Sequence, residues 1–201
     1  LSAEQKVQIG VGEAIHGKPI SICGPGTGLG VANLVAIDGT WHSLSGEGGH
    51  VDFAPVDQQE IAILNFLMTK YARVSYEQLL SGLGLEQIYQ ALSFIKNGTS
   101  SQLSAKEITT NGLANHCELC AETLAQFCRV LGSFAGNLAL TLGSYGGVYI
   151  AGGIVPRFIE YFQASDFRMR FEAKGRMSGF NQPMPTFVVT EEQPGLLGAS
   201  A

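Results

Sequence analysis

The fold is decided by the run Pro19-Ile-Ser-Ile-Cys23, the turn Gly24-Pro-Gly-Thr-Gly-Leu-Gly30, and the runs Gly30-Val-Ala-Asn-Leu-Val-Ala-Ile37 and Trp41-His-Ser-Leu44. The three runs are short and rich in apolar residues, and the Asp38-Gly39 dipeptide between the last two is typical of hairpin turns. Consecutive strands joined by such turns pair antiparallel. The sequence therefore predicts a sheet that begins with three antiparallel strands.

After these strands the hydrophobic period changes to that of helices. Asp57 followed by Glu60 is a capping-box pattern, and apolar residues at three-and-four spacing follow it. The same kind of start occurs at Ser75 and at Ser104. We expect helices over residues 57–71, from 75, over 85–95 and from 104.

A longer helix is expected from Asn115, with Glu118 completing its cap, to about Gly143. Gly132 and Gly136 lie one turn apart on this helix. Because glycine has no side chain, we expect another backbone to approach the helix closely at these two positions.

The last third of the chain predicts a strand, a turn, a helix and a strand. Val148–Ala151 is a buried strand, Gly152-Gly153 a turn, Pro156 the start of a helix, and Thr186–Val189 a last strand. Residues 1–18 have weak periodicity and are expected to be the tail of a helix and a loop. The order predicts an α/β fold with a mixed sheet and helices on both faces, a ribonuclease-H-like lobe rather than a Rossmann fold, with 1–201 as a single domain.

Composition limits the classes of partner. The formal net charge of −5 argues against nucleic acid and against an anionic membrane surface, because both need clustered Lys and Arg. The four cysteines and the lack of a charged-then-apolar leader favour the cytoplasm. His116, Cys117 and Cys120 lack a second ligand pair at zinc spacing, so we expect packing cysteines and no metal site.

The glycine turn after the first strand is a candidate anion site. It lacks the Lys-Ser/Thr of a P-loop and the third glycine of a dinucleotide fingerprint. The N–H groups of Gly26 and Gly28 could converge on a phosphate, with the Thr27 hydroxyl as a further donor. A plain β-turn that needs positive φ values is an equal alternative. Gly152-Gly153 also has two interpretations. It could be a flat surface for adenine or ribose, or it could be only a tight strand-to-helix turn.

Acidic and imidazole side chains form the second candidate site. Glu47 and His50 are separated by two glycines just after a strand, an arrangement suited to sugar hydroxyls, which both donate and accept hydrogen bonds. A solvated turn remains the alternative, and a catalytic base at Glu47 ranks below ligand binding. Taken alone, Glu77 at a helix start is better explained by the helix dipole.

Seven segments taken together, in order along nearly the whole chain, resemble the bacterial glucokinase family, which belongs to the sugar kinase, heat-shock protein and actin superfamily. The segments are Gly24-Pro-Gly-Thr-Gly-Leu-Gly-Val-Ala32, Gly46-Glu-Gly-Gly-His-Val-Asp-Phe-Ala-Pro55, Val74-Ser75 with Glu77, Leu80-Ser-Gly82, Gly136-Asn-Leu-Ala-Leu140, Ile150-Ala-Gly-Gly-Ile-Val-Pro-Arg157 and Pro194-Gly-Leu-Leu-Gly198. The five residues directly after His50, Val-Asp-Phe-Ala-Pro, contain no cysteine, so the resemblance is to the zinc-free branch of these kinases.

The resemblance implies two lobes that close over glucose and ATP, with Mg²⁺ bound through the nucleotide. It implies that Gly26, Thr27 and Gly28 form the second phosphate loop and that Gly152 and Gly153 form the adenosine loop. It also implies that Glu47, His50 and Glu77 contact glucose hydroxyls, which reverses the preference for a dipole role at Glu77. The implied reaction is phosphorylation of the glucose 6-hydroxyl, a step of glycolysis.

The family's first phosphate loop and its catalytic Asn-Asp pair have no match in this sequence. We therefore expect the chain to be the larger C-terminal lobe, without the N-terminal lobe and without a terminal helix, and to be inactive alone. Three alternatives stay open: a kinase for another hexose, a non-enzymatic sugar sensor, and, for the oligomeric state, a homodimer.

Overall fold

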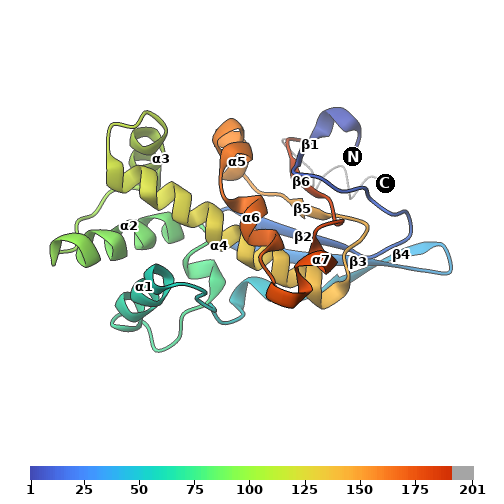
Figure 1. The fold of residues 1–201 in the computed structure, drawn as a ribbon, viewed down its shortest axis with the longest axis horizontal. Helices are drawn as coiled ribbons and strands as arrows, with labels where there is room; N and C mark the ends of the chain where they lie inside the picture. The colour runs from blue at the N-terminus through green and yellow to red at the C-terminus, as the bar shows by residue number, and fades with distance from the viewer. Residues whose placement is uncertain (192–201) are drawn as a thin grey trace.

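One six-stranded mixed sheet forms the centre of the computed structural model, which describes residues 1–191 (Figure 1). Its strands lie in the order β1-β6-β5-β2-β3-β4. β2, β3 and β4 pair antiparallel, as predicted, and β5 lies parallel to both β2 and β6. The strands are β1 (Lys6–Ile9), β2 (Ile20–Pro25), β3 (Leu29–Ile37), β4 (Thr40–Ser45), β5 (Val148–Ile150) and β6 (Thr186–Val189). The mixed sheet is confirmed.

The edge strand β1 corrects one expectation, because residues 1–18 were expected to hold no strand. β1 pairs antiparallel with β6, with Lys6 opposite Val189. The Lys6 ammonium also lies 4.6 Å from the centroid of the Phe187 ring, a cation–π contact. A four-residue edge strand has too few positions for a periodic pattern, and its partner lies near the other end of the described chain.

Two of the helices, α1 and α3, begin at the capping residues predicted for them, Asp57 and Ser104. The helices are α1 (Gln58–Met68), α2 (Gly82–Asn97), α3 (Ala105–Leu113), α4 (Glu118–Leu142), α5 (Ile159–Ala164), α6 (Phe167–Glu172) and α7 (Ser178–Asn181), and the 3-10 turns include η2 (Gly48–His50), η3 (Tyr76–Gln78) and η4 (Val155–Phe158). The Asp57 carboxylate accepts the Glu60 N–H at 2.8 Å and caps α1. The helix expected from Ser75 is only the turn η3.

The start of α4 is a second correction. Its N-cap is Cys117, whose sulfur accepts the Cys120 N–H at 3.3 Å. Asn115 instead has a φ of +53°, a value that asparagine tolerates better than most residues. At the other end, the helix stops at Gly143, as predicted, and this glycine has the left-handed conformation. The cysteines near His116 therefore cap and pack a helix.

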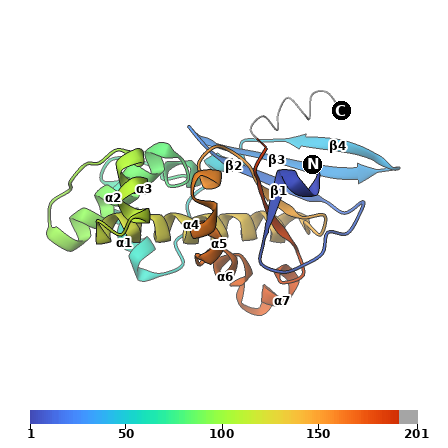
Figure 2. The same ribbon diagram turned by 90° about the horizontal axis from the view of Figure 1, so that it is seen from above.

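Close packing of α6 on α4 confirms the prediction for the two helix glycines. A Cβ atom at Gly132 would lie 2.3 Å from the Phe167 carbonyl oxygen, and one at Gly136 would lie 2.6 Å from that of Phe171. α4 runs from the helical end of the molecule, formed by α1 to α3, to the sheet, with α6 and α7 beside it (Figures 1 and 2). Helices were expected on both faces of the sheet; within residues 1–191 the helix layer lies on the α4 side.

A buried ion pair joins α1 to α6. The Glu60 side chain is 1% exposed, and it accepts a hydrogen bond from the Arg170 guanidinium at 2.6 Å. Asp57 and Ser133 bind the rest of the guanidinium at 3.1 Å each. Because neither charge reaches bulk water, each depends on the other for compensation.

In the part of the chain described, no helix is both long enough and apolar enough to cross a membrane. The segment Pro194–Gly198, which contributes to the family resemblance, lies outside the described residues.

Candidate functional site

His50 and Glu77 are brought together by the pairing of the segments that adjoin them. Residues 51–53 and 74–76 run antiparallel, with backbone hydrogen bonds of 2.9 and 3.1 Å. His50 precedes the first segment and Glu77 follows the second. Their side chains therefore meet, with His50 Nε2 at 3.8 Å from Glu77 Oε1. The contact links a loop after β4 to the turn η3.

One Glu77 oxygen is fixed, while the other faces His50. Oε2 accepts the Leu29 N–H at 2.9 Å, which ties the carboxylate to the start of β3. Gly28 makes this approach possible, because a Cβ atom there would lie 2.6 Å from the same oxygen. With 32% of its side chain exposed, Glu77 can present Oε1 to a hydroxyl group.

Glu47 lies on the same short turn as His50 and is the N-cap residue of η2. The His50 N–H donates to its carbonyl oxygen at 3.0 Å. Within residues 1–191 no hydrogen bond or ion pair joins the Glu47 carboxylate to His50 or Glu77. Gly49 fixes the turn against β3, since a Cβ atom there would lie 2.1 Å from the Leu29 carbonyl oxygen. Two of the three expected sugar contacts are thus adjacent, and the third is held on the same turn.

The glycine turn between β2 and β3 packs on the beginning of α2. The Gly26 N–H donates to the Gly28 carbonyl at 2.8 Å, and the Gly82 N–H donates to the Gly26 carbonyl at 2.9 Å. Gly26 therefore uses its own donor to shape the turn. In the described part of the chain, the N–H groups of Thr27 and Gly28 have no acceptor, which leaves them for an incoming anion.

The second glycine pair lies directly beside this turn. Gly152 has a φ of +82°, and a Cβ atom there would lie 2.5 Å from the Pro25 carbonyl oxygen, so the position requires glycine. Gly153 has no neighbour within 4 Å of its Cβ position. Parallel pairing of β5 with β2 places the two glycine segments at the same edge of the sheet, where ligands of α/β proteins gather.

A cleft of about 840 Å³ opens beside both glycine segments and contains Gly26, Thr27 and Gly153. Gly28 and Gly152 do not line it. Its other walls come from α2, α3 and η4, and they are formed by Gly82, Leu85, Ala105, Lys106, Thr109, Thr110, Leu113, Ile154, Arg157 and Phe158.

Sequence reasoning gave no role to Lys106 or Arg157. Arg157 ends a segment that carries the family resemblance, which was the available signal for it. Nothing local in the α3 sequence indicates that this helix folds over the glycine turn.

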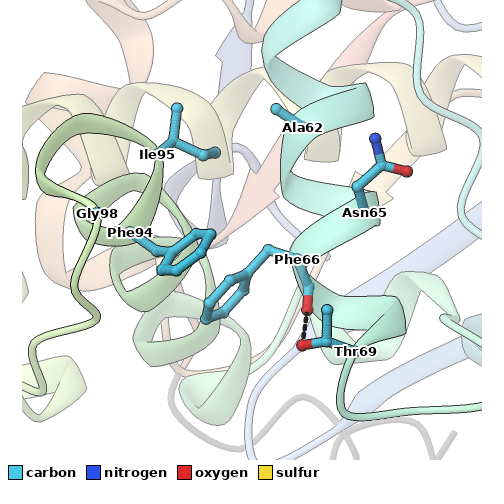
Figure 3. A pocket seen from close by; sticks show the side chains of 7 residues that line it. All are labelled: Ala62, Asn65, Phe66, Thr69, Phe94, Ile95 and Gly98. Atoms are coloured by element: carbon cyan, nitrogen blue, oxygen red, sulfur yellow. Dashed lines mark hydrogen bonds between the residues drawn. The ribbon is translucent and has the colours of Figure 1, made fainter.

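A second hollow, of about 480 Å³, lies between α1 and α2 (Figure 3). Phe66 and Phe94 line it and pack on each other with ring centroids 5.3 Å apart, and the Thr69 hydroxyl donates to the Phe66 carbonyl oxygen at 2.7 Å. It contains none of the predicted site residues. The cleft at the glycine segments is therefore the better candidate for a ligand site.

Known proteins that are similar to this chain include glucokinases from several organisms. A family model described as Glucokinase matches residues 1–201. A glucokinase of Colwellia psychrerythraea is 62% identical over the whole chain, which covers 62% of that protein, and one of Shigella sonnei is 50% identical with 63% covered. The crystal structure of a glucokinase from an Antarctic psychrotroph has a TM-score of 0.94 and 39% identity, and the chain covers 62% of it.

A more distant structure, a Balamuthia mandrillaris glucokinase in complex with glucose, shares the fold, with a TM-score of 0.71 at 22% identity. The chain thus spans a little over three-fifths of the length of the curated relatives it matches.

Proposed function

The chain belongs to the glucokinase family, and on that premise we propose that the full-length protein transfers the γ-phosphoryl group of ATP to the 6-hydroxyl of glucose. The observation that carries the proposal is the contact of His50 with Glu77 directly beside the glycine turn, with 3.8 Å between their side chains. A sugar held there lies next to a phosphate held at Thr27 and Gly28.

In this proposal the chain is the larger C-terminal lobe and performs binding and positioning. Glu77 and Glu47 accept hydrogen bonds from glucose hydroxyls, and His50 accepts or donates one. Once a bound sugar covers them, such polar contacts discriminate against sugars that lack the matching hydroxyl, because the protein group is then left without a partner.

The nucleotide lies along the cleft. Thr27 and Gly28 bind its phosphates through free N–H groups, the Gly26 turn shapes this loop, and Gly152 and Gly153 border the adenosine. Mg²⁺ would be held through the nucleotide phosphates and would neutralise part of their charge. We place the aspartate that takes the hydroxyl proton in the N-terminal lobe, which belongs to the nearly two-fifths of the relatives' length that this chain does not span.

A coupled assay for glucose 6-phosphate with the full-length protein tests the proposal. We expect ATP-dependent turnover of glucose, lower kcat/KM for fructose, mannose and N-acetylated hexosamines, and no turnover by residues 1–201 alone. A full-length protein that binds glucose without forming glucose 6-phosphate would be a sensor instead of a kinase. A higher kcat/KM for one of the other sugars would refute glucose as the substrate.

A further inference from the structure

Two cationic side chains stand on different walls of the nucleotide cleft, and neither has a role in the site described above. Lys106 belongs to α3 and Arg157 to η4, and both line the cleft with Thr27 and Gly153. Both residues are exposed. Their segments are about 50 residues apart in the sequence and meet only through the fold.

Neither cation is neutralised by the protein within residues 1–191: no hydrogen bond or ion pair engages the Lys106 ammonium or the Arg157 guanidinium. The nearest carboxylate along α3 is occupied, since Glu107 accepts the Ser104 N–H at 2.9 Å and its hydroxyl at 2.6 Å. The described lining residues of the cleft include no Asp or Glu. In a chain of net charge −5 this cleft is therefore locally positive.

The rest of the lining indicates which part of a nucleotide the cations face. Leu85, Leu113, Ile154 and Phe158 give the cleft an apolar section suited to a base. The sugar contacts and Gly28 place the transferred phosphoryl group beside Glu77, outside the lining of the cleft, and this is the other end of the bound nucleotide. The phosphates that remain on the nucleotide must lie between these two ends. These remaining phosphates are the anionic part of a nucleotide in the cleft, and anions are what Lys and Arg side chains bind.

We propose that Lys106 and Arg157 bind the α- and β-phosphates of the nucleotide from two sides of the cleft, and so determine the affinity of the enzyme for ATP and ADP over the nucleoside. This inference rests on the proposed kinase function. It adds a cationic clamp to the backbone donors of the glycine turn. Because ADP keeps both phosphates, the clamp acts on the product as well as on the substrate.

The test uses the full-length protein and the variants Lys106→Gln and Arg157→Gln. Matched controls are Lys18→Gln and Arg176→Gln, which remove one exposed positive charge each from residues that do not line the cleft. ADP and adenosine binding are measured by calorimetry, and KM values for ATP and glucose by the coupled assay.

For each cleft variant we expect the Kd of ADP and the KM of ATP to rise about tenfold, the scale of one charge-assisted hydrogen bond. Adenosine affinity and the KM of glucose should match those of the controls. An unchanged Kd for ADP refutes the clamp, and an equal loss for adenosine moves the contact from the phosphates to the nucleoside and refutes it as well. A native protein that binds ADP but fails to phosphorylate glucose contradicts the proposed function alone, because the calorimetric comparison still decides the clamp.

Discussion

Replacement of Glu77 by glutamine should reduce glucose phosphorylation while leaving the fold intact. Glutamine keeps the shape of the side chain, and its carbonyl oxygen can still accept the Leu29 N–H that Glu77 Oε2 accepts at 2.9 Å. What is lost is the negative charge beside His50, and with it a charge-assisted hydrogen bond to the sugar, which contributes ~1.5–3 kcal/mol. That loss corresponds to a fall of ~10- to 100-fold in kcat/KM for glucose.

Replacement of Glu77 by alanine distinguishes the structural role of the carboxylate, which accepts the Leu29 N–H, from its proposed role in sugar binding. Glu77→Ala also removes the acceptor of the Leu29 N–H, and Leu29 is a buried residue, so we expect a further loss of ~1–3 kcal/mol in the free energy of unfolding. The assays are steady-state kinetics of the full-length protein and urea unfolding, with Glu13→Gln as a control at an exposed site. A kcat/KM for Glu77→Gln within threefold of the control would refute the role of this carboxylate in sugar binding.

Three further changes test the packing around the site. Arg170→Met leaves the buried Glu60 carboxylate without its cation, so the free energy of unfolding measured in urea should fall by ~3–5 kcal/mol. Part of this loss should be recovered when Glu60 is also replaced by an apolar residue. A loss under ~1 kcal/mol would contradict the role of the ion pair. Burial lowers the pKa of Lys174 to about 8, so the folded state releases this proton at lower pH than the unfolded state does. The contribution of Lys174 to the free energy of unfolding therefore increases between about pH 8 and 10. Thermal melts of Lys174→Met at several pH values should lack this increase. The same dependence of stability on pH in the variant and in the native protein would contradict the lowered pKa. Gly152→Ala should raise the KM of ATP and lower the melting temperature, because the new Cβ atom would meet a carbonyl oxygen and the residue has a positive φ. Gly153→Ala should change both quantities less, because its Cβ atom would meet no neighbour. Equal effects of the two substitutions would contradict a special requirement for glycine at position 152.

Local patterns were sufficient for most of the fold because the signals are local. The hairpin runs over 19–44 and the cap at Asp57 concern residues within a few positions of each other, and both appear in the structure as expected. Even the approach of another backbone to Gly132 and Gly136 follows from the residues alone, because adjacent turns without side chains leave room on one helix face.

The features that the sequence did not predict depend on partners far along the chain. β1 is a strand because it pairs with the edge of β6. The four residues that begin at Lys6 contain no local pattern that predicts this pairing. Glu60 was expected to complete a capping box at Asp57. Its carboxylate instead accepts the Val56 N–H and pairs with Arg170, an interaction that exists only once α6 has packed on α4.

The candidate site likewise has residues that the sequence indicated and residues that only the fold brings together. Glycine spacing indicated the turn at Gly26–Gly28, and the resemblance indicated His50 and Glu77, but the cations at Lys106 and Arg157 became visible only when α3 and η4 were seen to close the cleft. The carboxylate of Glu47 stays a predicted contact, because its turn is in place while its side chain meets neither of the other two residues in the described structure.

The most direct test of the account is a crystal structure of the full-length protein with glucose and a non-hydrolysable ATP analogue. We expect Glu47, His50 and Glu77 all to lie within hydrogen-bonding distance of one hexose, with the terminal phosphate over Thr27 and Gly28. A hexose bound elsewhere, with these side chains directed to solvent, would contradict it.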